Sequence, residues 1–239
     1  MARQPRKTTK SKTKRRPVLR LALRWLLRGI LVVIVLGVAW IALYAVVAPP
    51  TTPYMIAERH RLGEVRQVWR PMEEISPHLA RAVVAAEDAN FCLHSGFDMD
   101  AIRAAISEGM NRGGSTISQQ VVKNAFLWQG RSWARKALEG LMTPVMELIW
   151  TKARVLEVYL NIVEFDEGVF GAEAAAQHYF GVSAAELNPT QAARLAAVLP
   201  NPRERSASSP TAELRARAAR IADGAATILA DGRDDCFAR

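Results

Sequence analysis

The sequence has little cysteine and no nucleotide-binding glycine motif. Its two cysteines, Cys92 and Cys236, are too few for a disulfide framework, and they lack the spacing of a metal site. Neither a Rossmann fingerprint nor a GxxxxGK[ST] loop occurs, which argues against a nucleotide-binding enzyme. A single bridge between the two cysteines and a pair of unpaired thiols are both compatible with the sequence.

Acidic residues are absent from positions 1–28, which hold eleven Lys or Arg. The net charge of +9 comes from this tail, because the rest of the chain has 21 basic and 23 acidic residues. A basic chain can indicate nucleic-acid binding. Here the basic block stops where a hydrophobic run begins, as in the cytoplasmic flank of a membrane protein, so we expect no nucleic-acid partner.

Charged residues are also absent from positions 29–48. Twenty such residues form roughly 30 Å of helix, about the thickness of the hydrocarbon core of a bilayer. The alternative is a cleavable signal peptide, but the run is longer than a usual signal core and residues 45–48 make a poor cleavage site. We predict a cytoplasmic tail at 1–28, an uncleaved transmembrane helix at 29–48, and an exported part after Pro50.

The exported part contains few alternating β-branched runs and no internal repeat. A connector at 49–75 has weak strand signals near 65–69. A domain at 76–239 follows, and its helices are short and unequal, which favours an irregular α-rich fold over a regular bundle. Helix starts are indicated by capping patterns at Ser76-Pro77, Asp98, Thr116 with Gln119, Ser183 with Glu186, Asn188-Pro189 and Ser209-Pro210.

The first candidate site is the segment 87–96, which follows the apolar residues 82–86 at the end of a predicted helix. Glu87 would lose solvation there, and Asp88 adds a like charge. Both effects raise the pKa of Glu87 toward the range of a general base. The simpler interpretation is the solvated end of an amphipathic helix.

The second candidate is the segment 113–124. Two glycines before a Ser-Thr helix start present backbone amides and the positive end of a helix, which suits a phosphate. Paired glutamines offer hydrogen bonds to sugar hydroxyls. An ordinary capped helix explains Thr116 and Gln119, but it leaves unexplained Gln120, Lys123 and Asn124.

The third candidate is the run RKALE at 135–139, in which Arg135, Lys136 and Glu139 share one helical face. A surface ion pair would contribute about 0.3–0.5 kcal/mol. The alternative is a second carboxylate with a cationic cluster that holds a diphosphate leaving group. Two further segments, 152–161 and 171–181, have the apolar spacing of core helices, although Glu157 would need a partner there.

Together these segments resemble the peptidoglycan glycosyltransferases, the domain that monofunctional transglycosylases share with bifunctional penicillin-binding proteins. The motifs E-D-x-x-F-x-x-H-x-G, G-x-S-T-I-x-Q-Q-x-x-K-N, R-K-x-x-E, K-x-x-I-L-E-x-Y-L-N and G…AAxxYFG stand here, in that order, at 87–96, 113–124, 135–139, 152–161 and 171–181. Val155 in place of isoleucine is the one departure. The resemblance covers roughly 76–202, and because the chain ends at Arg239 we expect the monofunctional form.

The resemblance implies a mostly α, lysozyme-like fold with a head lobe and a mobile jaw at roughly 97–131, where Phe126, Leu127 and Trp128 would touch lipid. It implies that lipid II is polymerised into β-1,4-linked glycan with inversion and release of undecaprenyl diphosphate. Glu87 would be the general base, and Glu139 would be the second catalytic acid, beside the diphosphate. The expected substrate-binding residues are Asp88, His94, Ser115, Thr116, Gln119, Gln120, Lys123, Asn124, Arg135, Lys136 and Lys152.

No cofactor is required by the resemblance, although a divalent cation (Mg or Mn) at the diphosphate fits the chemistry. The expected partners are lipid II, the nascent glycan strand and the membrane, with other cell-wall synthases and division proteins as further candidates. The expected location is the bacterial inner membrane, with the catalytic domain in the periplasm. Two alternatives stay open from the residues: a lysozyme-like hydrolase, and a catalytically silent membrane-tethered scaffold.

Overall fold

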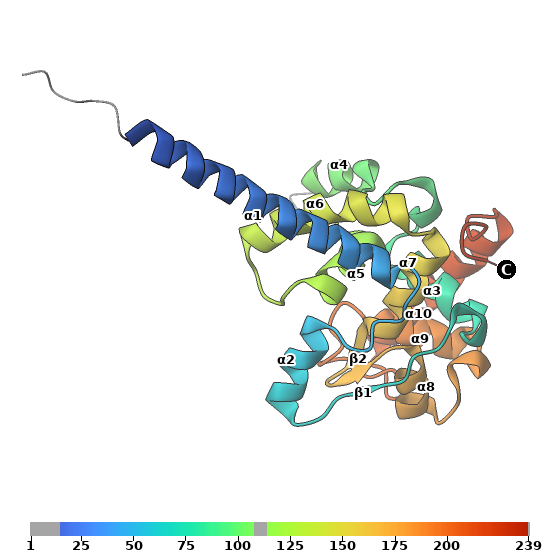
Figure 1. The fold of residues 1–239 in the computed structure, drawn as a ribbon. Helices are drawn as coiled ribbons and strands as arrows, with labels where there is room; N and C mark the ends of the chain where they lie inside the picture. The colour runs from blue at the N-terminus through green and yellow to red at the C-terminus, as the bar shows by residue number, and fades with distance from the viewer. Residues whose placement is uncertain (1–14, 108–113, 239) are drawn as a thin grey trace, which may run out of the picture.

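The computed structural model describes residues 15–107 and 114–238. The chain is mostly helical (Figure 1), which confirms the predicted fold class. The elements are α1 (Arg15–Tyr44), α2 (Pro53–Leu62), β1 (Arg66–Gln67), η1 (Met72–Glu74), α3 (Pro77–Glu87), η2 (Phe91–Leu93), α4 (Met99–Ser107), α5 (Ile117–Phe126), α6 (Trp133–Ile149), α7 (Lys152–Ile162), β2 (Glu164–Asp166), β3 (Val169–Phe170), α8 (Ala172–Phe180), η3 (Ala184–Glu186), α9 (Pro189–Val198) and α10 (Ala212–Ala230).

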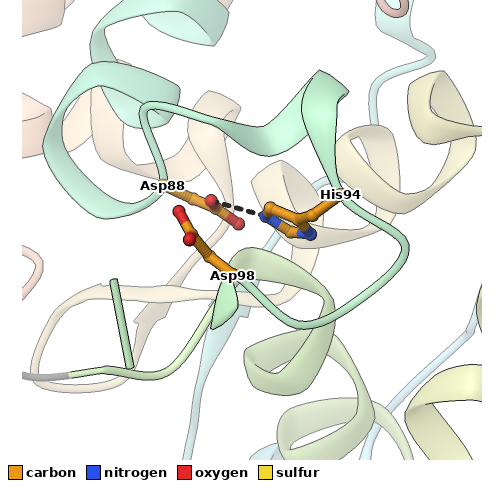
Figure 2. A group of neighbouring side chains, drawn as sticks. All are labelled: Asp88, His94 and Asp98. Atoms are coloured by element: carbon orange, nitrogen blue, oxygen red, sulfur yellow. Dashed lines mark hydrogen bonds and ion pairs between the residues drawn. The ribbon is translucent and has the colours of Figure 1, made fainter. Parts of the chain in front are cut away.

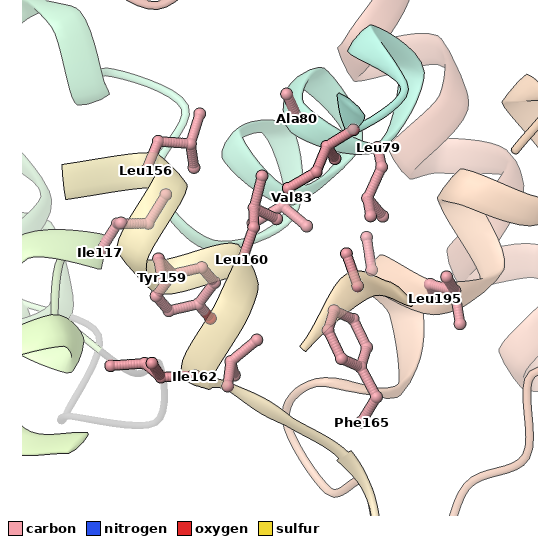
Figure 3. Close-up of a cluster of buried hydrophobic side chains, with 14 of the residues drawn as sticks. Leu79, Ala80, Val83, Ile117, Leu156, Tyr159, Leu160, Ile162, Phe165 and Leu195 are labelled. Atoms are coloured by element: carbon pink, nitrogen blue, oxygen red, sulfur yellow. The ribbon is translucent and has the colours of Figure 1, made fainter. Parts of the chain in front are cut away.

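The core forms around two groups of helices, α3 with α9 and α10, and α5 with α6 and α7. Helix α7 joins the groups, because its Leu156 and Leu160 are fully buried in the same cluster as Leu79 of α3 and Leu195 of α9 (Figure 3). The apolar positions predicted as core in the segment 152–161 are all buried. Helix α3 therefore has a fixed position relative to α5, and the first candidate motif lies at this junction.

Most of the predicted caps are confirmed. The pairs Thr116 with Gln119 and Ser183 with Glu186 both form capping boxes, and Asn188 caps α9. The Ser209-Pro210 pattern does not begin a helix, since the cap of the last helix is Thr211. The hydroxyl of Thr211 accepts the amide of Leu214 at 3.2 Å, so α10 begins at Ala212.

A small sheet in the order β1-β3-β2 lies beside the helices. The weak strand signal near 65–69 is confirmed by β1, which pairs in parallel with β3. The antiparallel hairpin of β2 and β3 was not predicted. Its strands have three and two residues, too few to show a period-two pattern in the sequence.

Helix α1 projects away from the rest of the molecule (Figure 1), and its segment Arg20–Tyr44 is long and apolar enough to cross a membrane. The helix ends at Tyr44 rather than at the predicted Ala48. Arg154 of α7 donates to the carbonyl of Tyr44 at 2.9 and 3.0 Å and to that of Val47 at 2.7 Å. Trp150 donates to the carbonyl of Ile41 at 2.8 Å. These bonds satisfy carbonyls that a helix end leaves free, so the domain itself caps the anchor.

The expectation that Phe126 and Leu127 touch lipid is wrong, since both are only 6% exposed. Phe126 packs against the end of α1, with its ring stacked 5.6 Å from Tyr44 and edge-on 5.3 Å from Trp40. Trp128 is half-exposed. The large exposed apolar side chains near α1 lie instead on α6, and they include Trp133, Leu141 and Leu148. The predicted jaw at 97–131 includes residues 108–113, which lie outside the described residues.

Cys92 and Cys236 form a disulfide, which decides between the two alternatives left by the sequence. The bridge joins η2, which lies within the first candidate motif, to the segment after α10. Arg81 adds an ion pair to Asp234 at 3.1 Å, with both side chains largely buried. The C-terminal segment is therefore attached to the same loop that carries the candidate site.

We predict that Cys92→Ser with Cys236→Ser lowers stability. The bridge closes a loop over a sequence separation of 144 residues, and the chain-entropy model assigns about 4–5 kcal/mol to loops of that length. Scanning calorimetry of the full chain in detergent should show a melting temperature lower by several degrees. Wild type in dithiothreitol is the matched control and should melt with the variant. Equal melting temperatures for oxidised wild type and the variant would contradict the prediction.

Candidate active site

Glu87 is the last residue of α3, where an apolar helix reaches the surface of a cavity. Its Oε2 accepts a hydrogen bond from Nε2 of Gln120 at 2.9 Å. Burial raises the pKa of Glu87 above its usual value, and the charge of Asp88 raises it further. The Gln120 bond and the charges of Arg217 and Lys123 oppose this rise, but they do not cancel it. The environment predicted for a general base is thus present.

Asp88 is almost completely buried and lies between two segments (Figure 2). Its Oδ2 accepts the amide of Ile117 at 3.0 Å, and its Oδ1 lies 2.9 Å from Nε2 of His94. A carboxylate at the first amide of a helix also interacts favourably with the helix dipole. Asp88 and His94 hold the end of α3 against the start of α5, and their expected role in substrate binding stays a prediction.

Asp88, His94 and Asp98 also bring ligand atoms within 4.8 Å of one another, close enough to hold a metal ion. Hydrogen bonds already occupy their oxygens. Oδ1 of Asp98 caps α4 by accepting the amide of Ala101 at 2.8 Å, and its Oδ2 accepts from Asn90 at 3.0 Å. These bonds account for the closeness of the three side chains without a metal ion.

The start of α5 is more fully occupied than the sequence suggested. Thr116 and Gln119 form a capping box and are both buried, and the hydroxyl of Thr116 donates to the carbonyl of Gly96 at 2.7 Å. The amide of Ile117 donates a hydrogen bond to Asp88, and the amide of Gln119 donates one to the hydroxyl of Thr116. The expectation of free backbone amides for phosphate is therefore wrong at these two positions.

Gly96 shows why the first motif ends in glycine. Its φ is +91°, a conformation that side chains rarely adopt, and a Cβ would lie 2.7 Å from Cγ2 of Thr143. The loop can approach α6 this closely only without a side chain.

A cationic cluster forms at the start of α6. Glu139 is 2% exposed, and its two carboxylate oxygens pair separately with Arg135 and Lys136, the latter at 2.9 Å. Nζ of Lys136 also lies 3.2 Å from Oγ of Ser115, which connects α6 to the loop before α5. The predicted sharing of one helical face is confirmed. Arg135 and Glu139 are largely buried, whereas the side chain of Lys136 is partly exposed.

Lys123 of α5 faces the same cluster. Burial lowers the pKa of Lys123, as does the charge of Arg135, while Glu87 acts in the opposite direction. Burial, Arg135 and Lys123 likewise lower the pKa of Lys136. The ammonium of Lys123 makes no hydrogen bond or ion pair with any residue that the structure describes. The fold therefore holds like charges together, an arrangement that a bound anion would stabilise.

Two hollows adjoin these groups. One, of about 270 Å³, is lined by Glu87 together with Asn90, Asp98, Ser115 and Thr116 among others. The other, of about 310 Å³, is lined by Lys123 together with Tyr54, Asn124, Gln129, Asn201 and Arg203 among others. Glu87 and Lys123 can thus both be reached by a ligand.

Comparison with known proteins identifies the family. The transglycosylase family model matches residues 55–226. A biosynthetic peptidoglycan transglycosylase of Jannaschia sp. is 63% identical over the full length of both chains. Those of Caulobacter vibrioides and Ectopseudomonas mendocina are 46% and 51% identical, over 90% and 79% of this chain and 96% and 79% of theirs. The chain belongs to the transglycosylase family. It is a glycosyltransferase with a lysozyme-like helical domain.

Two predicted site residues of the transglycosylase form polar contacts with other side chains of the protein. Lys152 pairs with Glu147 at 2.9 Å, and its Nζ lies 4.4 Å from the centre of the Phe91 ring, so its charge is used within the fold. Asn124 lines the second hollow but is buried, and its Oδ1 accepts from Gln129 at 3.1 Å.

Arg217 acts on the candidate site of the transglycosylase through its charge, which the sequence did not reveal. It lies on α10, 130 residues from Glu87, and its charge lowers the pKa of that carboxyl. Nε of Arg217 is buried and has no hydrogen-bond partner within the described part of the chain. The first half of α10 also carries Arg215 and Arg220 among alanines, so no spacing distinguishes Arg217 from its neighbours. Only the packing of α10 on α3 does.

We predict that Lys136→Ala lowers the rate of glycosyl transfer roughly 10- to 100-fold, because one of the charges facing the expected anion is lost. The melting temperature should change little, since Arg135 still pairs with Glu139. Arg103→Ala, which removes an exposed arginine of α4, serves as the control in the same transfer assay. Loss of stability that matches the loss of rate would instead show that Lys136 is structural.

Proposed function

We propose that the protein polymerises lipid II, the undecaprenyl-diphosphate-linked disaccharide pentapeptide, into β-1,4-linked glycan strands. The observation that carries this proposal is the position of Glu87 at an open cavity, next to a group of cations held by Glu139. The peptidoglycan transglycosylases to which the chain is similar support the same substrate.

Glu87 is the general base of the proposed reaction. It takes the proton from the 4-hydroxyl of the acceptor's GlcNAc while that oxygen attacks C1 of the MurNAc at the end of the growing chain. The bond from C1 to the diphosphate oxygen breaks, undecaprenyl diphosphate leaves with the electron pair, and the α-linkage becomes β. Burial supplies the basicity of Glu87, and Gln120 and Arg217 favour its ionised form.

Lys123, Arg135 and Lys136 stabilise the charge that develops on the leaving diphosphate. Glu139 positions two of them through its paired oxygens. This group also favours transfer over hydrolysis. A glycosidase expels a sugar hydroxyl, which needs a protonated acid rather than a set of cations.

The membrane arrangement fits a lipid-linked substrate. Helix α1 would anchor the chain in the inner membrane with the basic tail in the cytoplasm and the catalytic domain in the periplasm. The disulfide of Cys92 and Cys236 supports this orientation, because such bridges persist in oxidising compartments.

A divalent cation, if one takes part, would come with the diphosphate. The described residues around Lys123 and Lys136 offer cations rather than a carboxylate cage, and the bonds of the Asp88 cluster are already made. The proposed reaction uses the charges of the chain alone.

We predict that Glu87→Gln lowers glycan synthesis from detergent-solubilised lipid II at least ~100-fold, as expected for loss of a positioned base. Glu74→Gln, which changes an exposed carboxylate of η1, is the matched control. Gel analysis of labelled strands separates the alternatives. Shortening of existing strands by wild type would indicate a hydrolase. If wild type changes neither lipid II nor existing strands, the protein is a scaffold. Retained synthesis by Glu87→Gln would contradict the proposed mechanism.

The same substitution should raise stability at neutral pH. The pKa of Glu87 is higher in the folded chain than in the unfolded one. The folded state therefore binds more protons, and stability falls as the pH rises from about 4.3 through the raised value. Glutamine carries no such charge. Thermal melts should place Glu87→Gln above wild type at pH 7 and close to it at pH 4. A difference that does not depend on pH would contradict this prediction.

A further inference from the structure

We propose that Tyr159 is a positioning residue for catalysis: its hydroxyl fixes the orientation of the Gln120 amide, and through it the carboxylate of Glu87. The proposal rests on the role of Glu87 as general base. Tyr159 belongs by sequence pattern to the core of α7, and its ring lies in the buried cluster of Figure 3. Its hydroxyl oxygen is the one polar atom of the side chain.

Two hydrogen bonds connect the three residues. The Tyr159 hydroxyl donates to Oε1 of Gln120 at 3.1 Å, and Nε2 of Gln120 donates to Oε2 of Glu87 at 2.9 Å. The residues come from α7, α5 and α3, the helices whose packing fixes the candidate site. The chain of bonds therefore runs from the core to the base.

The chemistry of the end groups determines which way the amide faces. Burial raises the pKa of Tyr159 well above 10, and the charges of Glu87 and Asp88 raise it further, so the phenol keeps its proton. A buried hydroxyl needs an acceptor, and Oε1 of Gln120 is the acceptor it finds among the described residues. An ionised Glu87 can only accept. Turning the amide round would leave the phenol without an acceptor and place two oxygens face to face.

The consequence concerns the base. The bond from Gln120 favours the ionised form of Glu87 and so offsets part of the effect of burial. Without the Tyr159 hydroxyl, the amide can present either its oxygen or its nitrogen to Glu87. A larger fraction of Glu87 is then protonated at a given pH, and the carboxylate loses its fixed direction.

A purely structural role for Tyr159 makes a different prediction. If the hydroxyl only satisfies its own need for an acceptor, its removal lowers stability and leaves the pH dependence of catalysis unchanged. The pH profile of kcat/KM therefore distinguishes the two roles, because its acidic limb reports the ionisation of the base in the free enzyme.

The test is Tyr159→Phe in the full-length chain in detergent, assayed with lipid II between pH 5 and 9. The matched control is Tyr179→Phe, which removes another buried hydroxyl, one that donates to Asp166 at 2.9 Å. We expect the acidic limb of Tyr159→Phe to move to higher pH by roughly 0.5–1 unit, a three- to tenfold loss of rate below the midpoint that recovers at high pH. Tyr179→Phe should keep the wild-type midpoint. A wild-type midpoint in Tyr159→Phe, or a loss that is equal at every pH, would overturn the proposal.

A second variant completes the test. Gln120→Met keeps the length of the side chain and removes both bonds, so it should shift the midpoint in the same direction, and adding Tyr159→Phe should shift it no further. If Tyr159→Phe does not fold, a wild-type midpoint in Gln120→Met overturns the proposal by itself. The Glu87→Gln variant distinguishes failure of the proposed mechanism from failure of the positioning role of Tyr159. An active Glu87→Gln enzyme removes the base and the proposed mechanism, whereas an inactive one beside an unshifted Tyr159→Phe removes only the positioning role.

Discussion

The buried carboxylate of Asp88 is the contact on which the site depends. It accepts the first amide of α5 and bonds to His94, so it joins the end of α3, the following loop and the start of α5. Glu87 is the neighbouring residue, and Gln120 lies one turn into α5. The bonds of Asp88 therefore fix the distance between the proposed base and the helix that orients it. Asp88 also lines the cavity at Glu87, so this framework residue lies directly beside the candidate site.

The charged side chains of the candidate site are held together at a cost in free energy. A buried Glu87 and the adjoining cations of Lys123, Arg135 and Lys136 each lose hydration, and the cations repel one another. Glu139 offsets part of this cost, and the apolar packing of α7 keeps the helices in place. In the proposed reaction, an anion bound at the cations and a hydroxyl bound at Glu87 would offset the remaining cost of lost hydration and charge repulsion.

The sequence predicted most of what is local and little of what depends on distant packing. Capping boxes such as Thr116 with Gln119 are determined within four residues, and the structure confirms them. The charge of Arg217 acts on Glu87 only because α10 packs on α3, and no local pattern shows this. Phe126 is a large apolar residue of the kind that faces lipid, yet the end of α1 covers it. The substrate-binding roles of Gln119 and His94 stay predictions, because a motif shows which polar residues matter but not whether a cap, a carboxylate or a ligand takes their hydrogen bonds.

The junction between anchor and domain connects the fold to the membrane. A flexible linker would let the active site move over a range of heights, as glycine- or serine-rich linkers do. Here Arg154 and Trp150 bond directly to the last carbonyls of α1, and Phe126 at the end of α5 packs on the same turn. Helix α5 also carries Gln120 and Lys123. Helix α5 is thus fixed to α1, which is the membrane anchor in the proposed arrangement. For a substrate whose diphosphate stays at the lipid surface, such a junction sets the height of the cations as well as their spacing.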